Sequence, residues 1–194
     1  LPYSALSELG AIHPEEITNI RQELHTVNSK WKIHFINHHL AHLGNSFLLS
    51  GFEKSDFLVA DGFGENTSGI IGSTTLDEVT SLNTFRYPHS LGSFYSTFTE
   101  HLGFKPNGDE WKVMALASLG DPTVYYDLVK KLIKVDDINF ELDLSYFEHY
   151  LFFTKNYYSE KFVQVFGKPR DQGEELTQRH YNLVASVQKV AEET

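Results

Sequence analysis

The stretch that decides the fold runs from residue 38 to residue 65, and its two ends read His38-His39-Leu40-Ala41-His42 and Asp61-Gly62-Phe63-Gly64-Glu65. Between them lies the apolar run Phe57-Leu58-Val59-Ala60. If the histidine segment is helical, His38 and His42 lie one turn apart and point the same way. The apolar run is typical of a buried strand that ends at Asp61. The pattern therefore predicts a helix and a strand whose polar ends meet.

The histidine pair has the spacing of a metal site. Two imidazoles one helical turn apart can hold one metal ion, and an aspartate at a strand end can add a carboxylate. We expect His38, His42 and Asp61 to be the ligands. Imidazole with carboxylate suits Fe(II), Zn or Mn, and the sequence does not choose among these metals. The plainer alternative is a surface helix whose histidines are incidental.

Other residues of the same segment are candidates for ligand contact. His39 points away from His38 on a helix, so we assign it to substrate or phosphate contact. Gly62 and Gly64 let the backbone approach a phosphate closely. Glu65 and Asn66 are placed to contact a ribose, a hydroxyl or a bound water. An Asp-Gly pair is also a strong signal for a hairpin turn, and both interpretations can hold together.

A third group of residues follows in two segments: Ser90-Leu91-Gly92-Ser93-Phe94-Tyr95 and Glu110-Trp111-Lys112-Val113-Met114-Ala115-Leu116-Ala117. Taken alone, the first is a helix start with a serine cap, and the second is an amphipathic helix. Lys112 is either a solvated charge or a functional group, and its spacing leaves both interpretations open.

Composition limits the classes of function. The chain has 194 residues, 41% of them hydrophobic, and a formal net charge of −10. The charge and the scattered Lys and Arg argue against nucleic acid as a partner. No apolar stretch approaches the roughly 20 residues that span a bilayer, so we expect no membrane partner. With no cysteine, disulfides and thiolate metal sites are excluded. These features fit a cytoplasmic enzyme.

The pattern of the whole chain predicts an α/β fold, with a mixed sheet covered by helices. Trp31 to Ile36 is expected to be a short strand, Asn37 a helix N-cap and residues 56–86 an antiparallel meander. Residues 134–153 are expected to form an inserted hairpin or lid. Helices are expected at residues 14–27, 38–49, 91–102, 110–119, 122–133, 157–166 and 173–193. The chain begins at Leu1 and stops inside a helical pattern, so we interpret it as a fragment.

Read together, these segments resemble the O-carbamoyltransferase family that includes nodulation-type, cephalosporin and tobramycin carbamoyltransferases. The resemblance covers roughly residues 36–121, and four motifs occur in the family's order. They are His38-His39-Leu40-Ala41-His42, Asp61-Gly62-Phe63-Gly64-Glu65, the segment from Tyr87 to Tyr95 and the segment from Glu110 to Ala117. Two departures are Ala115, where the family typically has Gly, and Leu43-Gly44, where small residues are usual.

The resemblance implies part of a duplicated actin/hexokinase-like (ASKHA) fold, related to the tRNA threonylcarbamoyl transferase domain. It also implies that a separate domain, absent from this chain, makes carbamoyl-adenylate from carbamoyl phosphate and ATP. His38, His42 and Asp61 would then be metal ligands, and a further aspartate ligand would lie beyond Thr194. His39, Gly62, Gly64 and Lys112 would contact the carbamoyl-adenylate or the acceptor.

Our hypothesis is a metal-dependent transfer of a carbamoyl group to a hydroxyl of a small-molecule acceptor, with His39 and Lys112 as catalytic candidates. Gly62, Gly64, Glu65 and Asn66 are the candidates for binding the adenylate. Residues 1–194 would be one part of an actin-like domain, inactive alone, and a homodimer is one arrangement. The alternatives are a metal-dependent hydrolase and a non-catalytic nucleotide-binding module. A kinase of the same superfamily is a weaker alternative.

Overall fold

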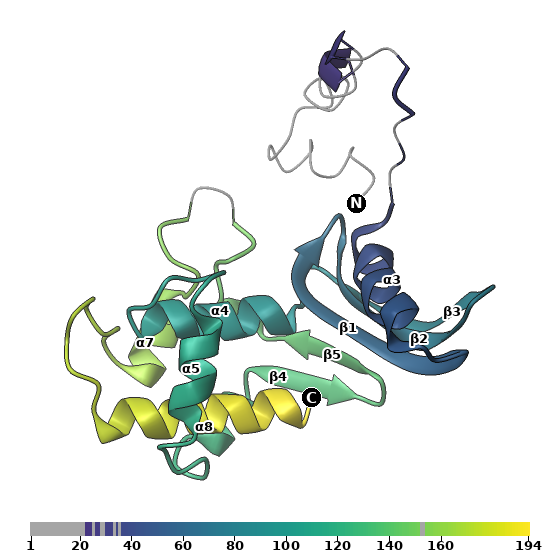
Figure 1. Ribbon diagram of the computed structural model, residues 1–194. Coiled ribbons are helices and arrows are strands. Elements are labelled where there is room, and N and C mark those ends of the chain that lie inside the picture. Colours follow the sequence, from purple (N-terminus) through teal and green to yellow (C-terminus); the bar gives the residue numbers. More distant parts are fainter. Residues whose placement is uncertain (1–21, 25, 28–29, 33, 35, 152–153) are drawn as a thin grey trace.

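The computed structural model describes residues 22–24, 26–27, 30–32, 34, 36–151 and 154–194. In this part of the chain a three-stranded sheet with one helix against it stands beside a group of helices (Figure 1). The predicted α/β class is confirmed. The predicted sheet type is wrong for the described residues, because the three-stranded sheet and the separate two-stranded one are both antiparallel rather than mixed.

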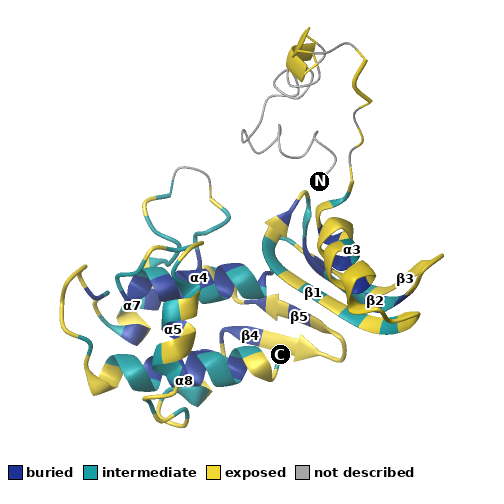
Figure 2. Ribbon diagram, in the orientation of Figure 1, coloured by how far each residue is buried: buried dark blue, intermediate teal, exposed yellow. Residues whose placement is uncertain are grey.

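The larger sheet is the predicted meander. Its order is β1-β2-β3, made by Lys54–Gly64, Thr67–Thr75 and Val79–Arg86. The register of β1 against β2 shifts between Ala60 and Gly64, so the chain bends where Asp61 lies. Burial alternates along β1 instead of being continuous (Figure 2). Leu58 is 61% exposed. The apolar run is therefore a half-buried strand, because a helix covers only part of the sheet.

That helix is α3, His38–Ser50. Asn37 caps it as predicted, since its side-chain oxygen accepts a hydrogen bond from the Leu40 amide at 3.1 Å. Gly51 ends it with a φ of 76°, a left-handed conformation that glycine adopts at little cost. Leu43 and Phe47 are buried and anchor the helix. Leu40, in the first turn of the same helix, is 39% exposed.

The helical part contains α4, α5, α6, α7 and α8, which span Leu91–His101, Glu110–Ala117, Tyr126–Lys130, Glu160–Phe166 and Gln178–Glu192. All five were predicted, but α6 is much shorter than expected and α8 begins later. Phe94, Phe98, Phe162 and Val187 are fully buried in one shared core. This core makes α4 a fixed support for the sheet, because α4 also contacts β1.

The hairpin expected within residues 134–153 is present as β4, Ile133–Asp136, and β5, Asn139–Leu142. A single turn of 3-10 helix, Leu144–Tyr146, follows it. Phe140 and Leu142 are buried in the same core as α4 and α8. This packing ties the hairpin to the body of the molecule, and its role as a lid stays a prediction.

The structure describes few residues before α3. Most of the helix expected at residues 14–27 lies outside the described residues. The strand expected at residues 31–36 is wrong for the four residues that are described there, since Trp31, Lys32, His34 and Ile36 have no strand structure. Alternation of apolar and polar residues over six positions does not make a strand without a neighbour to pair with.

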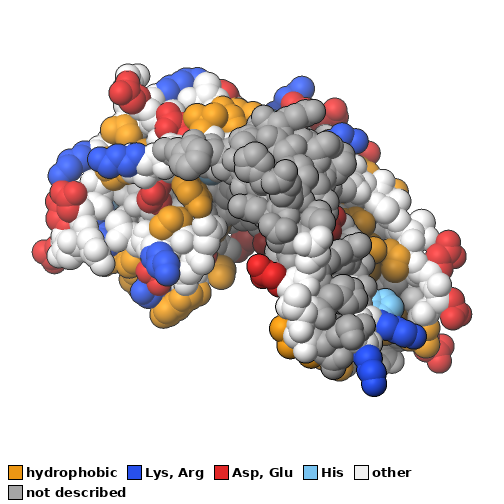
Figure 3. All heavy atoms as spheres, turned by 90° about the horizontal axis from the view of Figure 1, so that it is seen from above, with side chains coloured by type: hydrophobic (Ala, Val, Ile, Leu, Met, Phe, Trp, Pro, Cys, Tyr) orange, Lys and Arg blue, Asp and Glu red, His pale blue; other side chains and the backbone are white. Residues whose placement is uncertain are grey.

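The surface carries mixed charge. Figure 3 shows basic and acidic side chains interspersed over the described part of one face. Among the described residues, no helix is long and apolar enough to cross a bilayer.

The buried side chain of His101 makes the stability of the fold depend on pH. It is 1% exposed, its Nε2 lies 2.9 Å from the Gly167 carbonyl oxygen, and burial lowers its pKa to about 4. The unfolded chain takes up a proton below about pH 6.5, whereas the folded chain does so only near pH 4. Stability is therefore lost as the pH falls through this window. We expect His101 to account for a loss of about 2 kcal/mol between pH 7 and pH 5.

The measurement is urea unfolding at both pH values, for the unchanged protein and for His101→Gln, which keeps a donor for Gly167. The pH-dependent loss should be smaller in the variant by the stated amount. Equal losses in the two proteins would contradict the burial argument.

Candidate metal centre

The two expected metal-binding histidines come from the first turns of α3 and face the end of β1. His38 Nε2 lies 2.6 Å from Asp61 Oδ2, and His42 Nε2 lies 3.4 Å from the same oxygen. The two Nε2 atoms are 3.1 Å apart. The three residues form one group whose ligand atoms all lie within 4.8 Å of one another. The structure thus brings together the three residues that the sequence predicted as ligands.

Asp61 is held in place by its own turn and by the start of α4. The Gly62 amide donates a hydrogen bond to Asp61 Oδ1 at 2.6 Å, and Ser90 Oγ donates one to the Asp61 carbonyl at 2.8 Å. A Cβ built on Gly92 would lie 2.6 Å from the Asp61 carbonyl carbon. Only glycine fits this close approach of helix and strand. The position of the carboxylate is therefore set by α4 as well as by β1.

The electrostatics keep the carboxylate ionised. Burial opposes the charge on Asp61, but the hydrogen bonds from His38 and from the Gly62 amide, with the neighbouring imidazoles, outweigh it and lower its pKa. The side chains of His38, His42 and Asp61 are 45%, 54% and 32% exposed. Two imidazole nitrogens and a carboxylate oxygen, converging and open on one side, fit a divalent ion that keeps free positions for other ligands.

His39 lies on a different side of α3 and is 1% exposed. Its Nδ1 lies 2.9 Å from Thr67 Oγ1. The Thr67 hydroxyl donates a hydrogen bond to the Gly64 carbonyl oxygen at 3.2 Å. Burial, with the neighbouring His38, lowers the pKa of His39 and favours the neutral ring. In this structure the ring joins α3 to β2, and its contact with substrate stays a prediction.

The predicted adenylate-binding residues surround the same turn. Glu65 adopts a φ of 61°, and its Oε2 accepts a hydrogen bond from Asn37 Nδ2 at 2.8 Å. The carbonyl of Asn66 accepts a hydrogen bond from the Tyr87 amide at 3.2 Å. Gly62 is half-buried and Gly64 is buried. Glu65 thus orients the helix cap that precedes the histidines, and contact of these four residues with a nucleotide stays a prediction.

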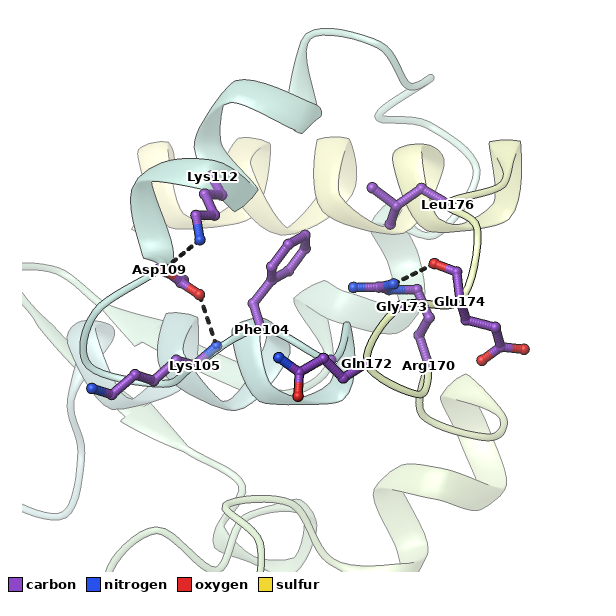
Figure 4. A pocket seen from close by; sticks show the side chains of 10 residues that line it. Phe104, Lys105, Asp109, Lys112, Arg170, Gln172, Gly173, Glu174 and Leu176 are labelled. Atoms are coloured by element: carbon purple, nitrogen blue, oxygen red, sulfur yellow. Dashed lines mark hydrogen bonds and ion pairs between the residues drawn. The ribbon is translucent and has the colours of Figure 1, made fainter.

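Lys112 is directed into a different pocket (Figure 4). Its Nζ lies 2.8 Å from Asp109 Oδ1 and 6.0 Å from the centre of the Phe104 ring. Arg170 lines the same pocket, and its Cζ lies 4.9 Å from the centre of the Phe104 ring. This pocket shares no lining residue with the pocket that contains Asp61. Lys112 is therefore not assembled with the three ligands, and its catalytic role stays a prediction.

Sequence reasoning missed a second group of residues near Asp61. A pocket of about 200 Å³ lies beside this carboxylate, and Tyr87, Asn107, His149 and Tyr157 are among the residues that line it. Tyr87 opens one of the motifs quoted above and Asn107 lies three positions before another, which was a usable signal. His149 and Tyr157 lie far along the chain in a segment with no motif, so only the fold reveals their position.

Comparison with known proteins assigns the chain to a family. A family model described as the carbamoyltransferase N-terminus matches residues 9–194. The chain belongs to this family. Nodulation protein NolNO of Sinorhizobium fredii is 33% identical over 174 residues, which are 89% of this chain and 24% of that protein. Nodulation protein NolO of Bradyrhizobium diazoefficiens is 34% identical over 160 residues, 81% of this chain and 26% of that protein.

An uncharacterized protein of a Synechocystis species is 37% identical over 161 residues, 81% of this chain and 26% of that protein. The chain therefore spans about a quarter of the length of these relatives. The resemblance drawn from the four motifs is confirmed, and it extends over nearly the whole chain.

The three-ligand geometry predicts how metal affinity responds to substitution. In the protein expressed from its complete gene, Asp61→Asn should weaken the binding of Zn²⁺ or Mn²⁺ by roughly tenfold or more, because the ion loses its only charged ligand among the described residues of the centre. Equilibrium dialysis with metal analysis measures this affinity. Asp56→Asn makes the same change on an exposed part of β1 and should leave the affinity unaltered.

The close packing of Gly64 against His38 gives an independent test. A Cβ built on Gly64 would lie 2.4 Å from the His38 ring, so Gly64→Ala must displace that ring. We expect weaker metal binding without loss of any ligand. Gly44→Ala is the matched control, because a Cβ there meets nothing within 4 Å. Unchanged metal affinity in Gly64→Ala would mean that the ring position does not matter for binding.

Proposed function

We propose that the chain carries the metal-binding part of a carbamoyltransferase active site, in which a carbamoyl group passes from carbamoyl-adenylate to a hydroxyl of a small molecule. The observation that carries the proposal is the convergence of His38, His42 and Asp61 at one point. Membership in the carbamoyltransferase N-terminus family supports the chemistry of the transferred group.

The metal would be Fe(II), Zn or Mn, held by the two Nε2 atoms and one carboxylate oxygen. When bound, such an ion supplies positive charge that polarises a carbonyl group and favours an anionic oxygen. The chain itself orients the ligands: Asn37 fixes the start of α3, and Ser90 fixes the backbone of Asp61. The open side of the centre leaves room for the reacting groups.

The proposed reaction forms one bond and breaks another. The acceptor oxygen bonds to the carbamoyl carbon, and the bond from that carbon to the phosphate oxygen of the adenylate breaks. Adenosine monophosphate leaves with the electron pair, and the hydroxyl proton passes to solvent. Gly62 and Gly64, with Glu65 and Asn66, border the turn next to Asp61 and are proposed to contact the adenylate. His39 and Lys112 are retained as catalytic candidates for the same step.

We further propose that the sheet with α3 belongs to an actin/hexokinase-like domain completed by other parts of the protein. The antiparallel meander followed by a helix against its end is compatible with one half of such a fold. Carbamoyl phosphate and ATP would be used by a separate adenylate-forming domain. The small share of the relatives' length that this chain covers supports such a division of labour.

Substitution of a ligand should separate the two half-reactions. In the protein expressed from its complete gene, His38→Ala should reduce carbamoyl transfer by at least about a hundredfold, since loss of a group that stabilises the transition state has effects of this size. Formation of carbamoyl-adenylate, followed by pyrophosphate released in the presence of carbamoyl phosphate, should stay within about twofold.

Two results would contradict this assignment. One is normal transfer in His38→Ala. The other is release of free carbamate at the same rate with and without a hydroxyl acceptor, which would favour the metal-dependent hydrolase instead.

A further inference from the structure

A buried arginine lies at the C-terminal end of α4. Arg170 is 9% exposed, and a Cβ built on Gly103 would lie 2.5 Å from its carbonyl oxygen. Its amide donates a hydrogen bond to the His101 carbonyl at 2.9 Å, and its Nε donates one to the Leu102 carbonyl at 2.6 Å. A further hydrogen bond runs from Nη1 to the Glu174 carbonyl. These contacts fix the guanidinium between the end of α4 and the loop that precedes α8.

The positive charge of Arg170 is not balanced by a carboxylate. It forms no ion pair with any Asp or Glu that the structure describes, and its side chain donates only to neutral carbonyls. The end of a helix carries only a partial negative charge, and burial of a full charge is costly unless an opposite charge lies near. Nη2 has no hydrogen-bond partner among the described residues, so its hydrogens are left for a ligand. The buried guanidinium therefore lacks an anion.

Arg170 lines the pocket of Figure 4, which has a volume of about 410 Å³. In this view the Phe104 ring stands between Arg170 and Lys112. Arg170 Cζ lies 4.9 Å and Lys112 Nζ lies 6.0 Å from the centre of that ring. Asp109 takes one hydrogen of the Lys112 ammonium group, which leaves the others for a ligand. Two cationic groups with unused donors therefore line one cavity.

The charge and the size of this pocket favour a phosphate monoester. Its lining contains three basic and two acidic residues, whereas the whole chain has a net charge of −10. A phosphate monoester carries close to two negative charges and several acceptor oxygens, so it can bind a guanidinium and an ammonium together. A carboxylate brings only one charge. The volume exceeds that of a phosphate group alone, and Phe104 and Leu176 offer apolar surface to an organic part.

We propose that this pocket is a second ligand site, separate from the candidate metal centre, and that it binds a small organic molecule that carries a phosphate monoester. Arg170 Nη2 and Lys112 Nζ hold the phosphate oxygens, and Phe104 and Leu176 contact the organic part. The phosphate supplies the charge that the buried guanidinium lacks. This inference goes beyond the proposed function, because it needs neither the metal ion nor the transfer of a carbamoyl group.

Isothermal titration calorimetry tests the site on the protein expressed from its complete gene and freed of metal with a chelator. The probe is phenyl phosphate, with benzoate as the matched carboxylate and inorganic phosphate as the ion without an organic part. We expect phenyl phosphate to bind more tightly than either. Lys112→Met, which keeps the apolar stem, should weaken its affinity about tenfold or more, since a hydrogen bond to a charged group is lost. Lys189→Met, which removes a surface ammonium paired with Glu193, is the control and should have no effect.

Arg170→Lys provides a second variant, because it keeps the positive charge but removes the planar fork of donors. It should also weaken phenyl phosphate, whereas Arg86→Lys, at an exposed position of β3, should not. Lys112→Met decides the matter if the change at Arg170 disturbs the fold. The inference is overturned if phenyl phosphate shows no saturable binding, if its affinity is unaltered in Lys112→Met, or if benzoate or inorganic phosphate binds as tightly. Loss of carbamoyl transfer in variants of the metal centre bears on the proposed function alone.

Discussion

The candidate site depends on one close approach, that of the first turn of α4 to the end of β1. Gly92 lies so near the Asp61 peptide that any side chain at this position would collide with backbone atoms. Backbone cannot move aside as a flexible side chain can, and packed interiors resist such displacement. Ser90, the cap of α4, uses the same oxygen both to bind the Ser93 amide and to reach the Asp61 carbonyl. The start of a helix therefore holds the carboxylate that faces both imidazoles.

Helical geometry directs the three histidines within residues 38–42 to two different sides of α3. His38 and His42 are one turn apart and lie together over the end of β1, while His39 is rotated by about 100° and faces the sheet. The buried ring contacts Thr67 on β2, and the exposed rings contact Asp61 on β1. The first turns of α3 thus supply both a contact that attaches the helix to the sheet and the two imidazoles of the candidate metal centre.

Local signals made much of the fold predictable. The cap at Asn37 and the glycine at Gly51 each depend on neighbours in sequence, so the helix between them was found. The three donors were also predicted, because helical spacing and a strand end determine their approach. The four-motif resemblance gave the family, which the comparisons confirm.

The remaining features depend on tertiary contacts. Lys112 is the exception, because its partner Asp109 lies only three positions earlier in the chain. Tyr157 meets Asn107 across fifty positions of chain, and no periodicity encodes such a pairing. The half-buried state of β1 likewise follows from which face α3 covers.

The candidate metal centre and the pocket beside it differ in how far apart their residues lie in the sequence. All three donors come from a helix and the next strand, with 23 positions between His38 and Asp61. Short loops close at lower entropic cost, so this pair can come together early in folding. The pocket needs partners as distant as Tyr157, and longer loops close at a greater entropic cost. A nascent chain can thus bring His38 and Asp61 together before it completes this pocket.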